Sequence, residues 1–274
     1  MVNSKAQPPF PSTNFPPVPL SRLIEGRHGL RVIGDTHSHA AELARAVDGA
    51  RASGLAVLLL GDINDRGPDV VGAMRIALDL LRQGDGEIIP GNHDWKLARW
   101  TRGRQVDATS AGFQETLEQI AVDPAGRDIA DVYAAAIAHR PLWTVLGGHV
   151  FVHAAFDPKM IELNPAPLLK DVNKVPGKLG PLAIYGEADG SVDAAGRPTR
   201  TYRWTDKVPE GVVVHVGHDP LSLTTPVFRR GAMGGLIRHM DTGIDRGGAL
   251  SWVDLPSEAF LHASEVEAIL TPVD

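Results

Sequence analysis

Three short segments in the first third of the chain are predicted to be strands, and each ends in a cluster of polar residues. The segments are residues 29–33, 55–60 and 87–90. The second is a continuous apolar run, which is typical of a central strand buried on both faces of a parallel sheet. Because glycine and a polar residue follow each segment, each strand is predicted to lead into a loop.

Two predicted helices separate these strands. Residues 40–52 repeat apolar positions at helical spacing, and residues 70–81 present one apolar face. Strands that alternate with helices of this length indicate strand–helix–strand units and therefore an α/β fold.

The polar loops after the three strands carry residues that bind metals in other proteins. Asp35, Asp62 and Asn92 are 27 and 30 residues apart, about the length of one strand–helix–strand unit. Right-handed crossovers place such loops side by side at one edge of a sheet. We therefore expect these three residues to converge with His37 and His93. Each loop alone could be a solvated turn, but three in phase are hard to explain that way.

The rest of the chain adds strands and two insertions. Further strands are expected at residues 150–152, 212–216 and 249–253. Region 104–148 has helical apolar faces and could form a cap over the site, whereas region 157–208 is rich in proline and glycine. A short helix is expected at residues 264–270.

Composition narrows the class of protein. The chain has 274 residues, 43% of them hydrophobic and 22% charged, as is usual for a globular domain. The net charge of -6 implies no broad basic face for nucleic acid. The absence of cysteine excludes a thiolate zinc site or a thiol nucleophile. No signal segment or membrane-spanning run is evident, and we expect a cytoplasmic protein without a membrane partner.

The chain is predicted to hold one domain, residues 26–274, after a proline-rich arm formed by residues 1–25. The preferred interpretation of the arm is a flexible tail without function. The alternative is that Phe10 and Phe15 dock it on the domain.

The loop at residues 61–67 indicates the chemistry. It offers the carboxylates of Asp62 and Asp65 and the guanidinium of Arg66. Divalent metals bind carboxylates, and arginine matches the oxygens of phosphate. Two metals that share a bridging carboxylate can activate water for attack on phosphorus, and Asp62 is the natural bridge. Mixed Asp, Asn and His ligands favour Mn²⁺, with Fe, Zn, Ni and Co as alternatives.

These loops resemble a known family. The blocks at residues 34–37, 61–67 and 91–94 are similar to the three signature blocks of binuclear metallophosphoesterases of the phosphoprotein phosphatase type. The remaining parts of the pattern are matched by His153, by Gly217 and His218, and by Asp241. The resemblance covers about residues 30–255. It implies a calcineurin-like α/β sandwich of two mixed sheets flanked by helices, with a helical insertion.

The resemblance also implies roles for individual residues. One metal would be held by Asp35, His37 and Asp62, and the other by Asp62, Asn92, His153 and His218. The catalytic residues implied by the family are His93, Asp65, Arg66 and Asp241. His93 would be the acid for the leaving oxygen, Asp65 would orient its ring, Arg66 would neutralise phosphate oxygens, and Asp241 would support the ligands or His93.

The segments at residues 96–99, 115–119, 185–187 and 241–248 look like the phosphatase module of bacterial polynucleotide kinase-phosphatase, although Ser38, Asn64, Ala155 and Asp219 depart from that pattern. No phosphate-binding loop of the kinase type is present. The substrate-binding residues we expect are Arg66, Arg203, Arg99 and Lys96. Trp95 and Trp100 could stack bases, and the alternative is an amphipathic helix with a solvated basic face.

We therefore expect a metal-dependent phosphoester hydrolase acting on nucleotide or polynucleotide ends, including 2′,3′-cyclic ends. The alternatives are a serine/threonine protein phosphatase, a dinucleoside polyphosphate hydrolase, or an inactive scaffold that keeps the fold for binding. The partner expected in each catalytic case is a phosphorylated substrate, which in the first case is an oligonucleotide end.

Overall fold

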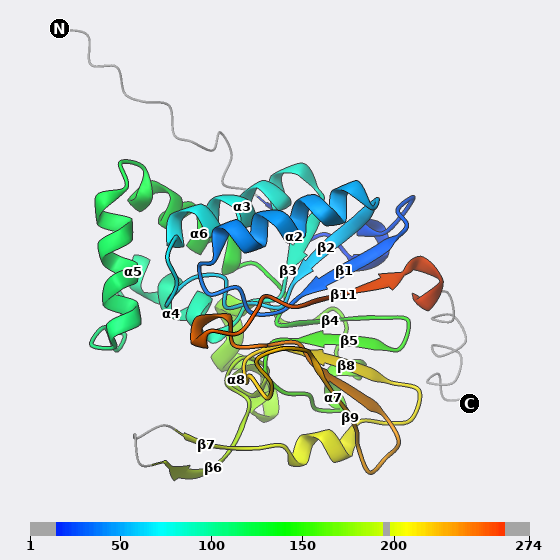
Figure 1. Cartoon of the computed structure of the whole chain (residues 1–274). Coiled ribbons are helices and arrows are strands. Elements are labelled where there is room, and N and C mark those ends of the chain that lie inside the picture. The colour runs from blue at the N-terminus through cyan, green and yellow to red at the C-terminus, as the bar shows by residue number, and fades with distance from the viewer. Residues whose placement is uncertain (1–14, 194–197, 261–274) are drawn as a thin grey trace, which may run out of the picture.

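A computed structural model describes residues 15–193 and 198–260. Two β-sheets form its centre, one above the other in Figure 1. The first has the strand order β11-β1-β2-β3 and the second the order β4-β5-β8-β10-β9. A separate two-stranded sheet pairs β6 with β7.

Parallel strands form the middle of both main sheets. β1 (Gly29–Ile33), β2 (Leu55–Leu59) and β3 (Gly86–Ile88) run parallel, and β11 (Trp252–Pro256) pairs antiparallel with β1. In the second sheet β5 (His149–Val152), β8 (Val213–Val216) and β10 (Leu236–His239) run parallel. Its antiparallel edges are β4 (Trp143–Leu146) and β9 (Val227–Arg230).

Apolar side chains on both faces of the first sheet hold the layers together. Leu30 and Leu58 point into a cluster that also contains Phe151 and Met240, so this cluster lies between the two sheets. The alternate residues, such as Leu59, belong to the larger cluster under the helices. Since both faces are buried, these strands are continuously apolar, as the sequence indicated.

Helices cover the outer face of the first sheet and one end of the sandwich. Figure 1 shows α2 (Ala40–Ala52) and α3 (Val70–Gln83) above the sheet, with α4 (Asn92–Thr101), α5 (Ala111–Val122) and α6 (Gly126–Ile137) stacked beside them. Asp69 caps α3 by accepting a hydrogen bond from the Gly72 N–H at 2.8 Å, and Gly84 ends the helix in the left-handed conformation.

Short elements complete the chain. The short helices are α1 (Leu20–Leu23), α7 (Lys159–Glu162) and α8 (Leu179–Tyr185). The hairpin consists of β6 (Glu187–Val192) and β7 (Pro198–Thr201). The 3₁₀ turns are η1 (Leu169–Lys174), η2 (Pro176–Lys178), η3 (Arg203–Lys207), η4 (Ile244–Arg246) and η5 (Ser257–Phe260).

Most predicted elements are confirmed, with two differences. Region 104–148 contains α5 and α6 as expected, but its end is the strand β4, whose short apolar run resembles a helix turn in the sequence. The last strand, predicted at 249–253, lies at β11 three residues later. The helix predicted at 264–270 lies outside the described residues.

The N-terminal segment is not free where the structure describes it. Phe15 is 8% exposed and packs on the core, and Leu20 and Leu23 are buried. The buried Arg140 guanidinium pairs with Glu87 at 2.7 Å and also donates to the Phe15 carbonyl. For residues 15–25 the flexible-tail interpretation is therefore wrong, and the docking of Phe15 is confirmed; Phe10 lies outside the described residues.

Candidate metal centre and active site

The polar loops after β1, β2 and β3 converge at one edge of the first sheet. Asp35 follows β1, Asp62 follows β2 and Asn92 begins α4 after β3. The loops touch closely at Gly91, where a Cβ atom would collide with the Asp62 carboxylate. Only glycine allows this approach, so the glycines of the sequence blocks have a steric role.

The loops assemble two groups of ligand atoms that share one residue. In one group the side chains of Asp35, His37 and Asp62 place ligand atoms within 4.8 Å of one another. In the other, Asp62 does the same with His153 and His218. His153 and His218 follow β5 and β8 of the second sheet, so both sheets contribute. The convergence expected from the strand spacing is confirmed.

The second group has the spacing of ligands around one ion. His153 Nε2 lies 3.5 Å from Asp62 Oδ2, 3.2 Å from His218 Nδ1 and 3.3 Å from Asn92 Oδ1. Neighbouring ligands are this far apart when each binds one cation at about 2.0–2.2 Å. Asn92 therefore fits as a fourth member of this group.

The imidazole rings are oriented for metal binding. His153 Nδ1 lies 2.6 Å from the Leu60 carbonyl, which accepts because Nδ1 carries a proton, so Nε2 is the ring atom that can bind a cation once the cation displaces its own proton. His37 Nδ1 and His218 Nε2 are buried and have no hydrogen-bond partner among the described residues. The protein's own hydrogen bonds thus leave these rings available to a cation.

The electrostatics of the group also require a cation. Burial raises the pKa of Asp35 well above its usual value, and the nearby Asp241 and Asp62 add to the effect. Burial acts in the same direction on Asp62, but His153 and His93 outweigh it and hold the pKa of Asp62 well below its usual range. Buried carboxylates at such short separation are stabilised by positive charge between them. The donor set therefore fits a pair of divalent metals.

His93 lies beside this group and is bound to Asp65. Its Nδ1 atom lies 2.5 Å from Asp65 Oδ2, and its Nε2 atom lies 3.9 Å from Asp62 Oδ2. Its side chain is 12% exposed, so it can reach a substrate at the centre. The structure thus brings His93 and Asp65 together as the sequence suggested.

Asp94 is a central residue of the site to which the sequence analysis gave no role. It is fully buried and accepts hydrogen bonds from the backbone N–H groups of Asp62, Ile63 and Gly91 at 2.8–3.1 Å. The Asn64 amide and the Tyr133 hydroxyl donate to it at 2.8 and 2.7 Å. The available signal was its place three residues after Gly91, where an acidic residue completes a capping box.

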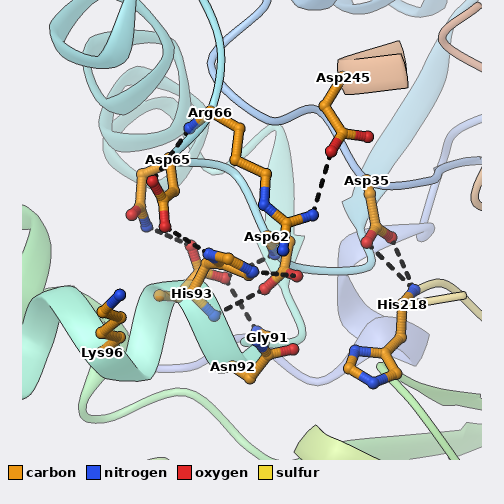
Figure 2. Close-up of polar contacts among 12 residues, drawn as sticks. Asp35, Asp62, Asp65, Arg66, Gly91, Asn92, His93, Lys96, His218 and Asp245 are labelled. Carbon is orange, nitrogen blue, oxygen red and sulfur yellow. Dashed lines mark hydrogen bonds and ion pairs between the residues drawn. The ribbon is translucent and has the colours of Figure 1, made fainter. Parts of the chain in front are cut away.

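Arginine side chains surround the entrance to the centre. Arg66 lines a cavity of about 490 Å³ together with Asp62, Asn92, His93 and His218. Arg200 and Arg246 line the same cavity. Figure 2 shows Arg66 extending toward Asp245, which it contacts at 3.0 Å. Asp245, Arg200 and Arg246 were not singled out as site residues in the sequence.

The other predicted substrate-binding residues do not line this cavity. Arg203 contacts Glu187 at 3.5 Å and its side chain is 70% exposed. Arg99 donates to the Gln105 carbonyl at 2.6 Å and Lys96 to the Ser110 hydroxyl at 3.0 Å. Arg200 lies in β7 and lines the cavity, whereas Arg203 lies beyond that strand at the start of η3, a difference that a sequence pattern cannot resolve. The substrate-binding role of these three residues stays a prediction without geometric support.

Two further expectations concern the helical regions. Among the described residues, none from region 104–148 lines this cavity, where Pro198, Thr199 and Arg200 from β7 lie instead, although α5 lines a neighbouring pocket with Arg66, so the cap stays a prediction. Trp100 is half-buried against the core with the Arg127 guanidinium 4.9 Å from its ring centre. This arrangement favours the amphipathic helix over a platform for bases.

Asp241 and His215 are both buried, with different surroundings. Burial raises the pKa of Asp241 to about 6, and the Gly243 N–H donates to its carboxylate at 2.8 Å. Its charge raises the pKa of the nearby Asp35, and its catalytic role stays a prediction. His215 lies in β8 and contacts His149 at 2.9 Å.

Comparisons with known proteins agree with this site. The chain is 25% identical over 217 residues to a protein of Geobacillus sp. (strain WCH70) named bis(5'-nucleosyl)-tetraphosphatase PrpE [asymmetrical], covering 78% of this chain and 77% of the relative. A protein of the same name from Bacillus subtilis (strain 168) is 25% identical over 224 residues, covering 80% of each.

The fold itself is found in solved structures. A cold-active protein-tyrosine phosphatase of a psychrophilic Shewanella matches with a TM-score of 0.53 and 14% identity, over 85% of this chain and 76% of that one. In the part of the chain that the structure describes, no helix is long and apolar enough to span a bilayer.

The family is shown by a match along most of the chain. The model of the calcineurin-like phosphoesterases matches residues 30–269, which include every predicted metal ligand. This family uses two divalent metals, in agreement with the two ligand groups that share Asp62. The chain belongs to the calcineurin-like phosphoesterase family and is a phosphoester hydrolase.

Proposed function

We propose that this chain hydrolyses dinucleoside polyphosphates with two divalent metal ions, Mn²⁺ being the preferred metal. The observation that carries the proposal is the shared ligand Asp62 at the edge of a cavity lined by Arg66, Arg200 and Arg246. Three guanidinium groups suit a chain of several phosphates better than a single phosphate monoester. The names of the curated relatives support the same substrate class.

The donor set supports the metal assignment. Asp35, His37 and Asp62 would hold one ion, and Asp62, Asn92, His153 and His218 the other. The bound ions would activate the attacking water and neutralise charge on the phosphoryl group. A mixture of carboxylate, amide and imidazole ligands without thiolate is compatible with Mn²⁺, and Fe, Zn, Ni and Co remain alternatives to be tested.

The protein's own residues then act on the substrate. Arg66 and Arg200 orient phosphate oxygens from two sides of the cavity, because one comes from the loop after β2 and the other from β7. His93 donates a proton to the leaving oxygen from Nε2, since its Nδ1 is bound to Asp65. Asp94 holds the Asp62 and Gly91 loops together by accepting a backbone hydrogen bond from each of these two residues.

A second candidate is the hydrolysis of 3′-phosphorylated or 2′,3′-cyclic polynucleotide ends, which the sequence favoured. It needs stacking residues on α4, and Trp100 is instead covered by Arg127. A protein phosphatase needs the same centre, so only a substrate comparison separates the three.

The test compares substrates on one preparation. We would load the metal-free full chain with Mn²⁺ and measure kcat/KM for a dinucleoside tetraphosphate, a 3′-phosphorylated oligonucleotide and a phosphopeptide. The proposal expects the dinucleoside tetraphosphate to be preferred by at least about tenfold, since each phosphate held by arginine adds binding. A preference for either other substrate overturns the substrate assignment. No metal-dependent turnover of any substrate would support the inactive scaffold.

A further inference from the structure

The loop that carries Asp65 and Arg66 has a backbone conformation that must be held from outside. Asp65 has φ 78° and Arg66 has φ 68°, so two consecutive residues other than glycine lie in the left-handed region. Such conformations persist only where surrounding contacts fix them. The contacts here come from α5 of the insertion, a helix with no lining residue in the metal cavity among the described residues.

Gln119 on α5 fixes the far end of this loop. Its amide nitrogen donates to the Gly67 carbonyl at 2.9 Å, and its amide oxygen accepts from the Val70 N–H at 2.8 Å. One side chain therefore provides a hydrogen-bond donor for the loop carbonyl and an acceptor for the first turn of α3. The N–H groups of that turn have no partner within the helix.

Thr116 on the same helix contacts the carboxylate that orients His93. Its hydroxyl lies 3.1 Å from Asp65 Oδ1 and 3.0 Å from the Gly112 carbonyl. The hydroxyl has one proton, and a hydrogen bond to a charged carboxylate is stronger than one to a carbonyl. The proton is therefore directed to Asp65, whose other oxygen lies 2.5 Å from His93 Nδ1.

The Thr116 hydroxyl and the Asp65 carboxylate are both shielded from water. Thr116 is 0% exposed and Asp65 is 1% exposed, so no water replaces the hydroxyl if it is removed. The Arg66 N–H is the only other described group bonded to Asp65 Oδ1, at 3.0 Å, and it belongs to the same loop. Apart from the bond to His93 on α4, Thr116 is thus the contact that ties the carboxylate to a helix outside its own loop.

We propose that Thr116 is a positioning residue, which holds the Asp65 carboxylate so that His93 presents Nε2 to the leaving oxygen. The inference rests on the proposed function in assigning the proton transfer to His93. It adds that the α5 insertion controls this step, with Gln119 holding the loop. Because Thr116 touches no ligand residue, metal binding should not depend on its hydroxyl.

The kinetic test uses a variant series at one position. Thr116→Val removes the hydroxyl at nearly constant volume, and Thr116→Ser restores it. We expect Thr116→Val to lower kcat for phenyl phosphate about tenfold, as loss of such an orienting contact does, and to change kcat for 4-nitrophenyl phosphate less than about twofold. Thr116→Ser should recover most of the loss. Thr101→Val, which removes a hydroxyl bonded only to the Ala98 carbonyl, is the matched control.

A spectroscopic arm tests the geometry without turnover. In zinc-loaded, ¹⁵N-histidine-labelled protein, the His93 Nδ1–H proton is identified by its loss in His93→Gln. Thr116→Val should shift or broaden this signal, Thr116→Ser should restore it, and Thr101→Val should leave it unchanged. Gln119→Met should have a smaller effect in the same direction.

The two arms separate this inference from the proposed function. If the wild-type protein hydrolyses neither aryl phosphate, the proposed function fails and the kinetic experiment cannot test Thr116. The His93 Nδ1–H signal then still tests whether Thr116 positions Asp65 and His93. An unchanged signal in a folded Thr116→Val variant overturns the inference, as does a Thr116→Ser variant that behaves like Thr116→Val. Equal kinetic losses on both aryl phosphates would assign Thr116 a merely structural role and also overturn it.

Discussion

The carboxylate of Asp94 accepts a hydrogen bond from the backbone N–H of Asp62 at 2.8 Å. The residue that both ligand groups share is therefore held in place from the next loop along the chain. Asp62 itself has φ 48°, an unfavourable backbone conformation for a residue other than glycine. The position of the shared ligand is set by the surrounding fold and does not depend on a metal alone.

The first prediction concerns the shared ligand. Asp62→Asn should lose both metals and essentially all turnover, because an amide cannot bridge two cations as a carboxylate does. Elemental analysis and turnover of the purified variant check this. Two tightly held metals in the folded variant would show that Asp62 is not the bridge.

The second prediction concerns Tyr133, whose hydroxyl donates to Asp94 at 2.7 Å. Tyr133→Phe leaves a fully buried carboxylate with one donor fewer, and burial already raises the pKa of Asp94. We expect the free energy of unfolding to fall by about 1–3 kcal/mol and metal affinity to decrease. Denaturant unfolding and metal titration measure the two effects.

The control for that experiment is Tyr202→Phe. The Tyr202 hydroxyl lies 3.4 Å from the half-buried Asp219, a weaker contact, so stability should change by less than about 0.5 kcal/mol. An equal fall in the free energy of unfolding in both variants would mean that the Tyr133–Asp94 hydrogen bond stabilises the fold no more than the weaker Tyr202–Asp219 contact does.

The third prediction concerns His93. His93→Gln should keep both metals and lower turnover by about two to four orders of magnitude for substrates with poor leaving groups. Substrates with good leaving groups, which need no proton, should lose much less. A comparison of alkyl and 4-nitrophenyl phosphates makes the distinction, and equal losses would assign His93 another role.

The metal centre was predictable from the sequence because its geometry follows from the order of strands and helices. Once residues 55–60 are recognised as a buried parallel strand, Asp62 must lie at the carboxyl edge of the sheet. Asp35 and Asn92 are one unit away on either side, and right-handed crossovers bring them together. The resemblance then identified His153 and His218 as further ligands, which follow β5 and β8 of the second sheet.

The surroundings of the centre depend on contacts between distant residues, which the local pattern does not encode. In the sequence Asp94 looks like an ordinary helix-capping residue. Its second role, accepting hydrogen bonds from the loop after β2, is visible only in the folded chain. Phe15 is held by Arg140, which is itself paired with Glu87 in β3. Arg200 and Arg203 look equivalent in the sequence, but the first lies in β7 at the cavity and the second in η3 after the strand has ended.

The fourth prediction uses that pair of arginines. Arg200→Met should lower kcat/KM for a dinucleoside tetraphosphate about 10- to 100-fold, because a cavity-lining guanidinium is removed near His218. Arg203→Met, at the exposed neighbouring site, should have less than a twofold effect, about the size expected for a surface pair. Similar losses in both variants would return Arg203 to the substrate site.

The fifth prediction concerns acid stability away from the metal centre. His149 and His215 lie 2.9 Å apart in the second sheet. Burial, and after it the nearby Arg238, lowers the pKa of His149 to about 4. Burial lowers the pKa of His215 well below its usual 6.5, with His149 and Arg238 adding to the effect.

The sign of the effect follows from proton uptake. Above pH 6.5 both rings are neutral in the folded and unfolded chain, so they add no pH dependence. Between pH 6.5 and 4 the unfolded chain binds protons that the folded protein refuses, so the free energy of unfolding falls as the pH falls. His149→Phe removes one of the two rings, next to Phe151 with which it stacks. Denaturant unfolding of metal-loaded protein at pH 7 and pH 5 should show a smaller acid loss in this variant than in the wild type. The carboxylates of the protein titrate equally in the variant and the wild type. An identical fall in the free energy of unfolding between pH 7 and pH 5 would therefore mean that this histidine pair does not contribute.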